Sequence, residues 1–204
     1  MSNSDFIPLT EAVIHAKIQQ IATNDVLVSQ LVADKASILL LRNALNAMGL
    51  ADFKSIFQCA GSVAFLRGDK PVVLRMNTGD GKSLVWHLSL YQKPPGFIVI
   101  VSSPLVSLNF DQFTQTMTRL GMTTENVVNL DGKTTPSMRA LLYERLRTHD
   151  PTLHVVFAST AMIEMNRNFQ DALLCANKFA FVRDEIFYIL HLREINNYNY
   201  HYSL

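Results

Sequence analysis

The sequence predicts an α/β fold in which a parallel sheet is flanked by helices. From residue 53 onward, short apolar runs take turns with stretches of helical patterning. Apolar runs without alternation are typical of strands that are buried on both faces. Glycine and proline stand between the runs, where the chain must turn. Strands that alternate with helices favour a parallel sheet with right-handed crossovers, and 204 residues are enough for one domain with its own core.

The first part of the chain is expected to be a helical extension over residues 1–49. Apolar residues recur near helical spacing between residues 11 and 48. Breaks or caps are expected at Asn24-Asp25 and at Asp34, and a helix stop at Gly49. The pattern therefore predicts two or three helices.

The α/β lobe is assigned to residues 50–190. Strands are predicted at 72–74, 97–101, 127–128, 154–157 and 179–182, and helices at 82–92, 105–119, 136–147 and 160–176. Residues 191–204 hold half of the six tyrosines and show no periodicity. This last segment is expected to be a disordered polar and aromatic tail.

The charge balance gives no sign of a polyanionic partner. With 18 basic and 17 acidic residues the formal net charge is +1, so a basic face would have to be local. Arg139, Arg145 and Arg147 form a modest basic cluster, which indicates a solvated helix face rather than a DNA-binding track. His87, beside the only tryptophan, is expected to pack within a helix rather than to take part in catalysis.

The cysteine usage and the N-terminus indicate an intracellular protein. Cys59 and Cys175 have no metal-binding or redox spacing and are expected to be buried thiols in a reducing compartment. The N-terminus has no signal-peptide pattern, and no apolar run reaches the ~18 residues of a membrane span.

A glycine-rich loop after the first predicted strand carries the clearest chemical signal. The loop reads Thr78-Gly79-Asp80-Gly81-Lys82-Ser83 and opens a helical stretch. The two glycines let backbone amides face a β-phosphate, Lys82 would reach the β- and γ-phosphates, and the Ser83 hydroxyl would bind Mg²⁺. Asp80 is expected to point outward, because a carboxylate beside phosphates is unfavourable. Met76 stands where the strict G-x-x-x-x-G-K-[ST] pattern has its first glycine, so an ordinary βα turn with an incidental lysine remains the alternative.

Two further segments, together with the short T-G-x-G-K-S form, resemble RecQ-type DNA helicases of superfamily two. Residues 53–58, ending in Gln58, resemble the element whose glutamine reads the adenine edge. Residues 101–112 closely match motif Ia, V-x-S-P-L-x-S-L-x-x-D-Q. The resemblance implies that this second segment contacts DNA through Ser103, Pro104, Ser107 and Gln112. A well-capped helix start would explain the same residues equally well.

The apolar run 179–182 leads to Asp184-Glu185, which resembles helicase motif II. The resemblance implies that Asp184 holds Mg²⁺ with Ser83 and that Glu185 polarises the attacking water. The family continues this motif with Ala or Cys and then His, whereas Ile186 and Phe187 follow here. Another departure is Thr160-Ala161, which replaces a Pro-Glu pair.

The resemblance covers residues 50–190 and implies a P-loop NTPase fold, the first RecA-like lobe of a helicase. It implies ATP and Mg²⁺ as cofactors, single-stranded or forked DNA as partner, 3′–5′ unwinding, and a nuclear location in a eukaryote. Because nothing resembles the second lobe, the chain alone is expected to bind nucleotide without unwinding DNA. Two alternatives remain: another P-loop module, which would need a base-recognition motif such as N-K-x-D, and a scaffold protein that kept the fold and lost the chemistry.

Overall fold

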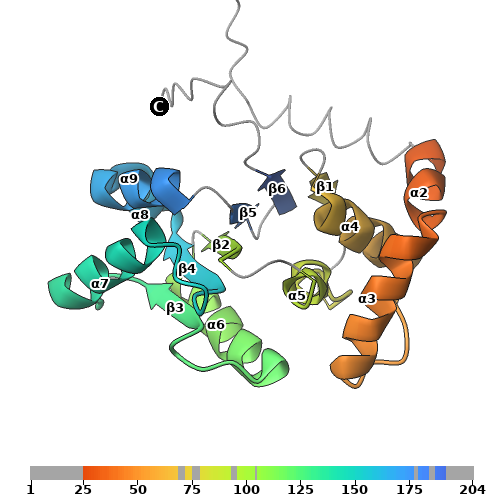
Figure 1. Cartoon of the computed structure of the whole chain (residues 1–204), viewed down its shortest axis with the longest axis horizontal. Coiled ribbons are helices and arrows are strands. Elements are labelled where there is room, and N and C mark those ends of the chain that lie inside the picture. The colour runs from red at the N-terminus through yellow and green to blue at the C-terminus, as the bar shows by residue number, and fades with distance from the viewer. Residues whose placement is uncertain are drawn as a thin grey trace, which may run out of the picture.

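A six-stranded sheet lies at the centre of the computed structural model, with helices on both sides (Figure 1). The structure describes residues 25–68, 72–74, 79–92, 96–103, 105–176, 179–183 and 187–191. The strand order is β1-β6-β5-β2-β4-β3. The strands are β1 (Val72–Leu74), β2 (Ile98–Ser103), β3 (Val127–Leu130), β4 (Val155–Ser159), β5 (Phe179–Arg183) and β6 (Phe187–His191).

Four of these strands confirm the predicted parallel sheet. β2 pairs in parallel with both β4 and β5, and β3 pairs in parallel with β4. Both β2 and β4 lie in the middle of this group, and their side chains are buried on both faces apart from the half-exposed Ser159. Their unbroken apolar sequences follow from this position.

Strand β6 was not predicted, and it runs against its neighbours. It pairs antiparallel with β5 on one side and with β1 on the other. Only residues 184–186 separate β5 from β6, too few for the crossover connection that a parallel neighbour needs. The last predicted strand ended at residue 182, so β6 is an addition to the predicted sheet. Residues 192–204, most of the expected tail, lie outside the described residues.

The helices begin and end largely where capping residues indicated. They are α2 (Asp25–Val32), α3 (Lys35–Ala47), α4 (Ile56–Arg67), α5 (Leu84–Leu90), α6 (Val106–Leu120), α7 (Pro136–Arg147), α8 (Thr160–Met165) and α9 (Arg167–Ala176). Asp34 caps α3 by accepting a hydrogen bond from the Ser37 amide at 3.1 Å. Thr135 caps α7 ahead of Pro136, and this helix matches its predicted range.

Two helix predictions differ from the structure. The expected single helix over 160–176 is divided at Asn166, whose backbone is extended. The Asn166 Oδ1 accepts a hydrogen bond from the Phe169 amide at 3.1 Å, while Nδ2 donates to the Tyr143 hydroxyl at 2.9 Å. These bonds favour a new start over a continued helix. Helix α4 was not predicted as an element; it packs against α2, α3 and α5, and half of its twelve residues are buried.

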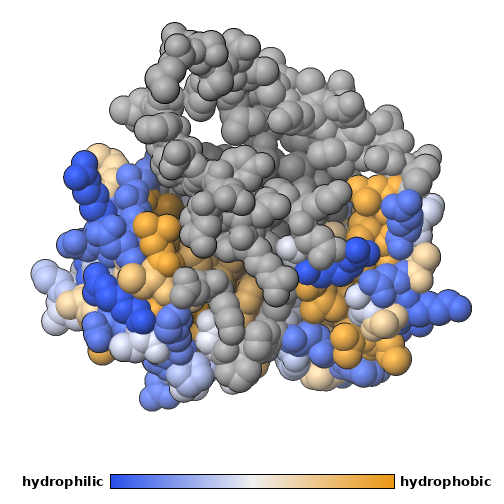
Figure 2. Space-filling model, turned by 45° about the horizontal axis from the view of Figure 1, so that its top comes forward, coloured by the Kyte–Doolittle hydropathy of each residue, from blue (hydrophilic) through white to orange (hydrophobic). Residues whose placement is uncertain are grey.

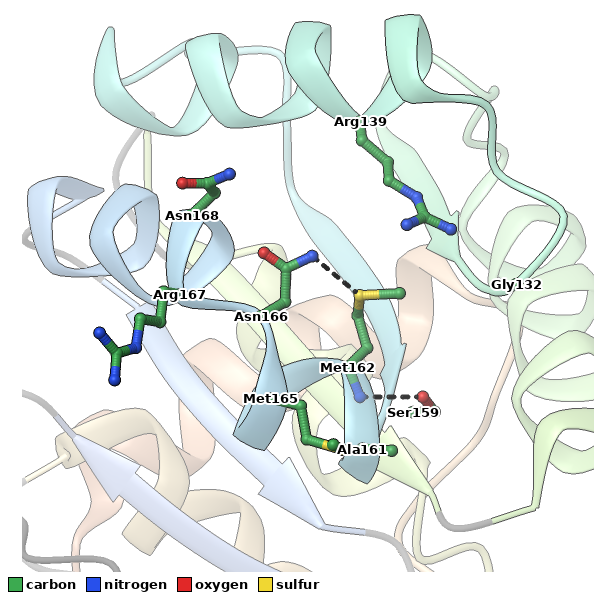
Figure 3. A pocket seen from close by; sticks show the side chains of 9 residues that line it. All are labelled: Gly132, Arg139, Ser159, Ala161, Met162, Met165, Asn166, Arg167 and Asn168. Carbon is green, nitrogen blue, oxygen red and sulfur yellow. Dashed lines mark hydrogen bonds between the residues drawn. The ribbon is translucent and has the colours of Figure 1, made fainter.

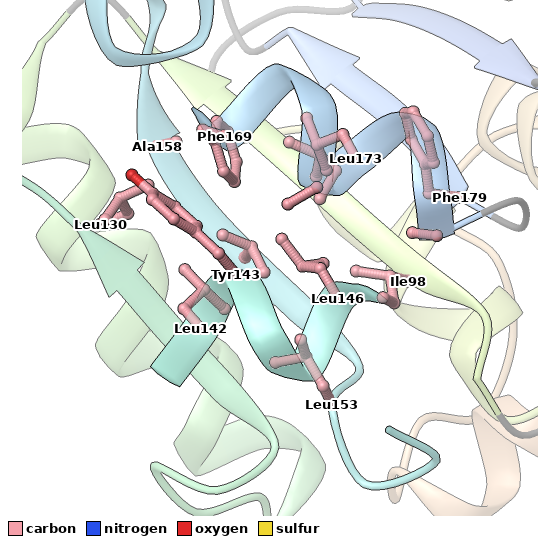
Figure 4. Close-up of a cluster of buried hydrophobic side chains, with 14 residues drawn as sticks. Ile98, Leu130, Leu142, Tyr143, Leu146, Leu153, Ala158, Phe169, Leu173 and Phe179 are labelled. Atoms are coloured by element: carbon pink, nitrogen blue, oxygen red, sulfur yellow. The ribbon is translucent and has the colours of Figure 1, made fainter. Parts of the chain in front are cut away.

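Alternate residues of the strands face two different layers of helices. Ile98 and Ile100 of β2 pack with α7 and α9, in a cluster that includes Leu146 and Phe169 (Figure 4). Their neighbours Val99 and Val101 face the opposite layer, formed by α4, α5 and α6. The sheet thus lies between two apolar layers, which is the three-layer arrangement of an α/β fold.

The described surface is uneven in polarity, and one cysteine prediction was wrong. Figure 2 shows apolar surface gathered on the side of α2 and α3, where Leu39 is 62% exposed. Both cysteines are free, but Cys175 is exposed on α9 and Cys59 is half-buried on α4. In the part of the chain that the structure describes, every helix is too short or too polar to cross a membrane.

Candidate functional site

The glycine-rich loop has the backbone geometry that its sequence requires. Gly79 and Gly81 have φ angles of +89° and +79°, in the left-handed region that L side chains rarely adopt. The chain then enters α5 through a turn in which the Leu84 amide donates to the Gly81 carbonyl at 3.0 Å. Two glycines at these positions therefore shape a loop that leads straight into a helix N-terminus.

Gln58 lies directly behind this loop and holds it. Its Nε2 donates to the carbonyls of Asp80 at 3.3 Å and Gly81 at 3.1 Å, and its Oε1 accepts from the Lys54 amide at 2.8 Å. The side chain is fully buried. This amide is therefore a structural link between α4 and the loop, a role that the sequence did not indicate. Reading of adenine by Gln58 remains a prediction.

Lys54 is a residue that the sequence reasoning did not single out. Its Nζ donates to the Gly79 carbonyl at 3.4 Å. Ser55 caps α4 by accepting a hydrogen bond from the Gln58 amide at 3.2 Å. The only sign of this contact in the sequence is a lysine four positions before Gln58, and lysine is too common a residue for that spacing to be informative.

Lys82 and Ser83 are left available for a ligand. Both side chains are half-buried, and neither has a hydrogen-bond partner within the described ranges. Ser83 occupies the N-cap position of α5, yet its hydroxyl makes no capping bond. The positive charge and the hydroxyl that phosphate and Mg²⁺ require are thus present beside the turn.

The carboxyl ends of β1 and β5 lie at the same edge of the sheet. β6 is antiparallel to both β1 and β5, so these two strands run in the same direction. Strand spacing of ~4.8 Å puts them about 10 Å apart. Thr78, Asp184 and Glu185 follow these strands in the sequence but lie outside the described residues, so a site that they share with the loop stays a prediction. Elsewhere in the described chain, no three His, Cys, Asp or Glu side chains are grouped to hold a metal ion.

The segment resembling motif Ia is split between buried and exposed residues. Ser103 ends β2 fully buried, and its Oγ accepts a hydrogen bond from the Leu105 amide at 3.3 Å. Ser107 is exposed in the first turn of α6, and Gln112 is half-buried further along. Pro104 lies outside the described residues. Ser103 therefore orders the helix entry, and Ser107 is the residue open to a partner.

His87 confirms its predicted packing role. It is 1% exposed, its Nε2 lies 3.0 Å from the Thr116 hydroxyl of α6, and its ring contacts Trp86 edge to face. Burial, aided by the charge of Arg119, lowers the pKa of His87 to about 3. The imidazole is therefore neutral and links α5 to α6.

The basic cluster on α7 is not the solvated face that was expected. Arg147 is exposed, but the Nε of Arg145 donates to the Asp150 carboxylate at 2.5 Å. Burial alone would raise the pKa of Asp150, yet hydrogen bonds from Arg145 and Thr152 lower it to about 2. Arg139 donates to the Asp131 carbonyl at 3.1 Å, and its Nε is buried without a partner. The sequence did not indicate these contacts, because the partners Asp131 and Asp150 lie outside α7.

Arg139 lines an open pocket of about 590 Å³ at the carboxyl ends of β3 and β4 (Figure 3). α7, α8 and the start of α9 surround it. Ser159, at the end of β4, caps α8 by accepting a hydrogen bond from the Met162 amide at 3.2 Å. Ligands of open α/β sheets bind outside the carboxyl ends of strands, so this pocket is a second candidate site.

Comparison with known protein families assigns most of the chain. Residues 57–197, well over half of the sequence, match the family model described as DEAD/DEAH box helicase. The matched range runs from the start of α4 through β6 and includes the glycine-rich loop. A search among curated proteins returned no match.

Proposed function

The chain belongs to the DEAD/DEAH box helicase family, and on that premise we propose that it is the ATP-binding lobe of a RecQ-type helicase acting on DNA with 3′–5′ polarity. The observation that carries the proposal is the loop of Gly79 and Gly81, which Gln58 holds from behind. The match of residues 101–112 to RecQ motif Ia supports DNA over RNA. A nuclear location, for a protein of a eukaryote, belongs to the same proposal.

The residues present fit ATP with Mg²⁺. The backbone of residues 78–83 would surround the phosphates, and Lys82 would bind the β- and γ-phosphates. The Ser83 hydroxyl, which makes no capping bond, and Asp184 would hold the ion, and Glu185 would orient the attacking water. Mg²⁺ neutralises charge that develops on the phosphates during transfer.

The DNA contact is assigned to the start of α6. Ser107 is exposed and would donate its hydroxyl to a backbone phosphate, with Gln112 and Pro104 nearby in sequence. Ser103 would contact the nucleic acid only through its backbone, because its buried hydroxyl accepts the hydrogen bond of the Leu105 amide.

Binding of a fluorescent ATP analogue with Mg²⁺, and ATP hydrolysis with single-stranded DNA or RNA of equal sequence, test the proposal. We expect nucleotide binding that Lys82→Ala removes, weak turnover that DNA raises more than RNA does, and no strand separation by this chain alone. Stimulation by RNA only would refute the RecQ assignment. Turnover comparable to that of a two-lobe helicase would refute the expected weakness.

A second candidate is a nucleotide-binding or scaffold protein without helicase activity. Met76 replaces the first glycine of the strict loop pattern, and Ile186-Phe187 replaces the family's residues after Asp-Glu. The absence of nucleotide binding by the wild-type chain, under conditions where it is folded, would favour this candidate.

A further inference from the structure

We propose that the pocket between α7, α8 and α9 takes one unpaired nucleobase of the bound strand and gives the chain a base preference at that position. The inference rests on the nucleic-acid role proposed above. It adds a site that backbone contacts alone would not create.

The position of the pocket relates it to the segment resembling motif Ia. Ser159 lines the pocket, and it is the register partner of Ser103 in the neighbouring strand β2. The next residue, Thr160, has its hydroxyl 3.1 Å from that of Ser102. Adjacent parallel strands lie ~4.8 Å apart, so a nucleic-acid strand that contacts the start of α6 passes close to the pocket.

The polar groups of the pocket suit a base edge or a phosphate. Arg167 and Asn168 are exposed at the start of α9, and neither side chain has a hydrogen-bond partner among the residues described. Arg139 is held in place by the Asp131 carbonyl, and Figure 3 shows its side chain extending from α7 toward Met162. Guanidinium and amide groups are the side chains that read base edges most often.

The remaining lining is apolar and favours a base. Ala161, Met162 and Met165 come from α8, and Met165 is 82% exposed. The Met165 thioether is therefore open to contact with a ligand in the pocket. The flexible thioether packs well against an aromatic ring. A phosphate needs only the cations, whereas a base has an apolar face for the methionines and a polar edge for Arg167 and Asn168.

The size of the pocket agrees with this occupant. At about 590 Å³, it lies in the range of small-molecule sites, which is ample for one nucleobase. A thioether contact with the ring of a base, together with a hydrogen bond from Arg167 or Asn168, contributes enough free energy to change affinity severalfold.

Abasic scanning tests the inference with the full chain. A duplex with a single-stranded DNA tail fixes the register, one tail nucleotide at a time is made abasic, and affinity is measured by fluorescence anisotropy. We expect one tail position at which the abasic change weakens wild-type binding by about fivefold or more. In Met165→Ala, the abasic change at that position should have almost no effect on affinity. Leu174→Ala, which removes a 58% exposed side chain of α9 outside the pocket, should retain the wild-type profile.

The outcomes separate this inference from the proposed function. Binding with a flat abasic profile, or a profile that Met165→Ala leaves unchanged, overturns the base pocket alone. A position sensitive to removal of phosphate charge by methylphosphonate but not to base removal also overturns it, because the pocket would then hold a phosphate. If the wild-type chain binds no nucleic acid, the proposed function fails and this inference fails with it.

Discussion

Substitution of Gly81 by alanine tests whether Gln58 and the phosphate loop form one rigid unit. A Cβ atom at Gly81 would lie 2.5 Å from the Gln58 Nε2, closer than real Cβ contacts come. The matched control is Gly79→Ala, where a Cβ would meet nothing within 4 Å. Both glycines have positive φ, so both substitutions carry the same backbone strain of about 1–2 kcal/mol.

The difference between the two variants isolates the collision. Gln58 is fully buried, and its amide donates to the carbonyls of Asp80 and Gly81. To clear the new methyl group it must give up these two hydrogen bonds, each worth about 0.5–1.5 kcal/mol. Gly81→Ala should therefore lower the free energy of unfolding by about 1–3 kcal/mol more than Gly79→Ala does.

Urea unfolding of both variants, without nucleotide, measures this difference. The same pair is then made in a Gln58→Ala background, where no amide remains to collide with. There the two alanine substitutions should cost the same within error. Equal costs in the wild-type background, or a difference that persists without Gln58, would show that the glutamine does not hold the loop.

Three further outcomes follow from the structure. The pKa of His87 is lowered to about 3 in the folded chain, so the neutral imidazole contributes fully to stability above pH 6.5 and less as the pH falls. Between pH 6 and 4, the free energy of unfolding of the wild type should therefore fall by about 1.4 kcal/mol per pH unit more than that of His87→Gln. Ser55→Ala removes the cap on α4 and should cost about 1 kcal/mol of unfolding free energy, whereas Ser107→Ala, on the exposed side of α6, should cost little. Phe169→Ala should cost about 3–5 kcal/mol because the ring is fully buried, with the exposed Leu174→Ala as its control; a cost below 1 kcal/mol would contradict the packing shown in Figure 4.

Local signals in the sequence predicted part of the fold well. Thr135-Pro136 marked the start of α7, because a hydroxyl cap and a proline without an amide both suit that position. The unbroken apolar run at 98–101 predicted a strand buried on both faces. In each case the physical cause lies within a few residues of the pattern.

Features that depend on distant partners could not be predicted in this way. The burial of Gln58 depends on carbonyls more than twenty positions along the chain. Helices α8 and α9 separate at Asn166, which bonds to Tyr143 of α7. β6 pairs with β1 on one side and with β5 on the other, and its five residues alone do not indicate that position.

In the candidate site too, local features could be predicted and features that depend on distant partners could not. The spacing of the glycines and the lysine that follows them predicted the loop, because its backbone geometry and its charge depend only on neighbouring residues. The pocket at Arg139 was missed, because its lining comes from three helices and a strand end that no motif connects.

Mg²⁺-dependent binding of a fluorescent ATP analogue to the wild-type chain and to Lys82→Ala tests directly whether the glycine-rich loop is a nucleotide site. The Lys82 side chain has no hydrogen-bond partner within the described residues, so its loss should leave the urea midpoint unchanged. We expect saturable binding by the wild type and at least tenfold weaker binding by the variant, a loss of about 1.4 kcal/mol or more. Equal affinity of two folded proteins, or no binding by the wild type, would contradict a nucleotide site on this loop.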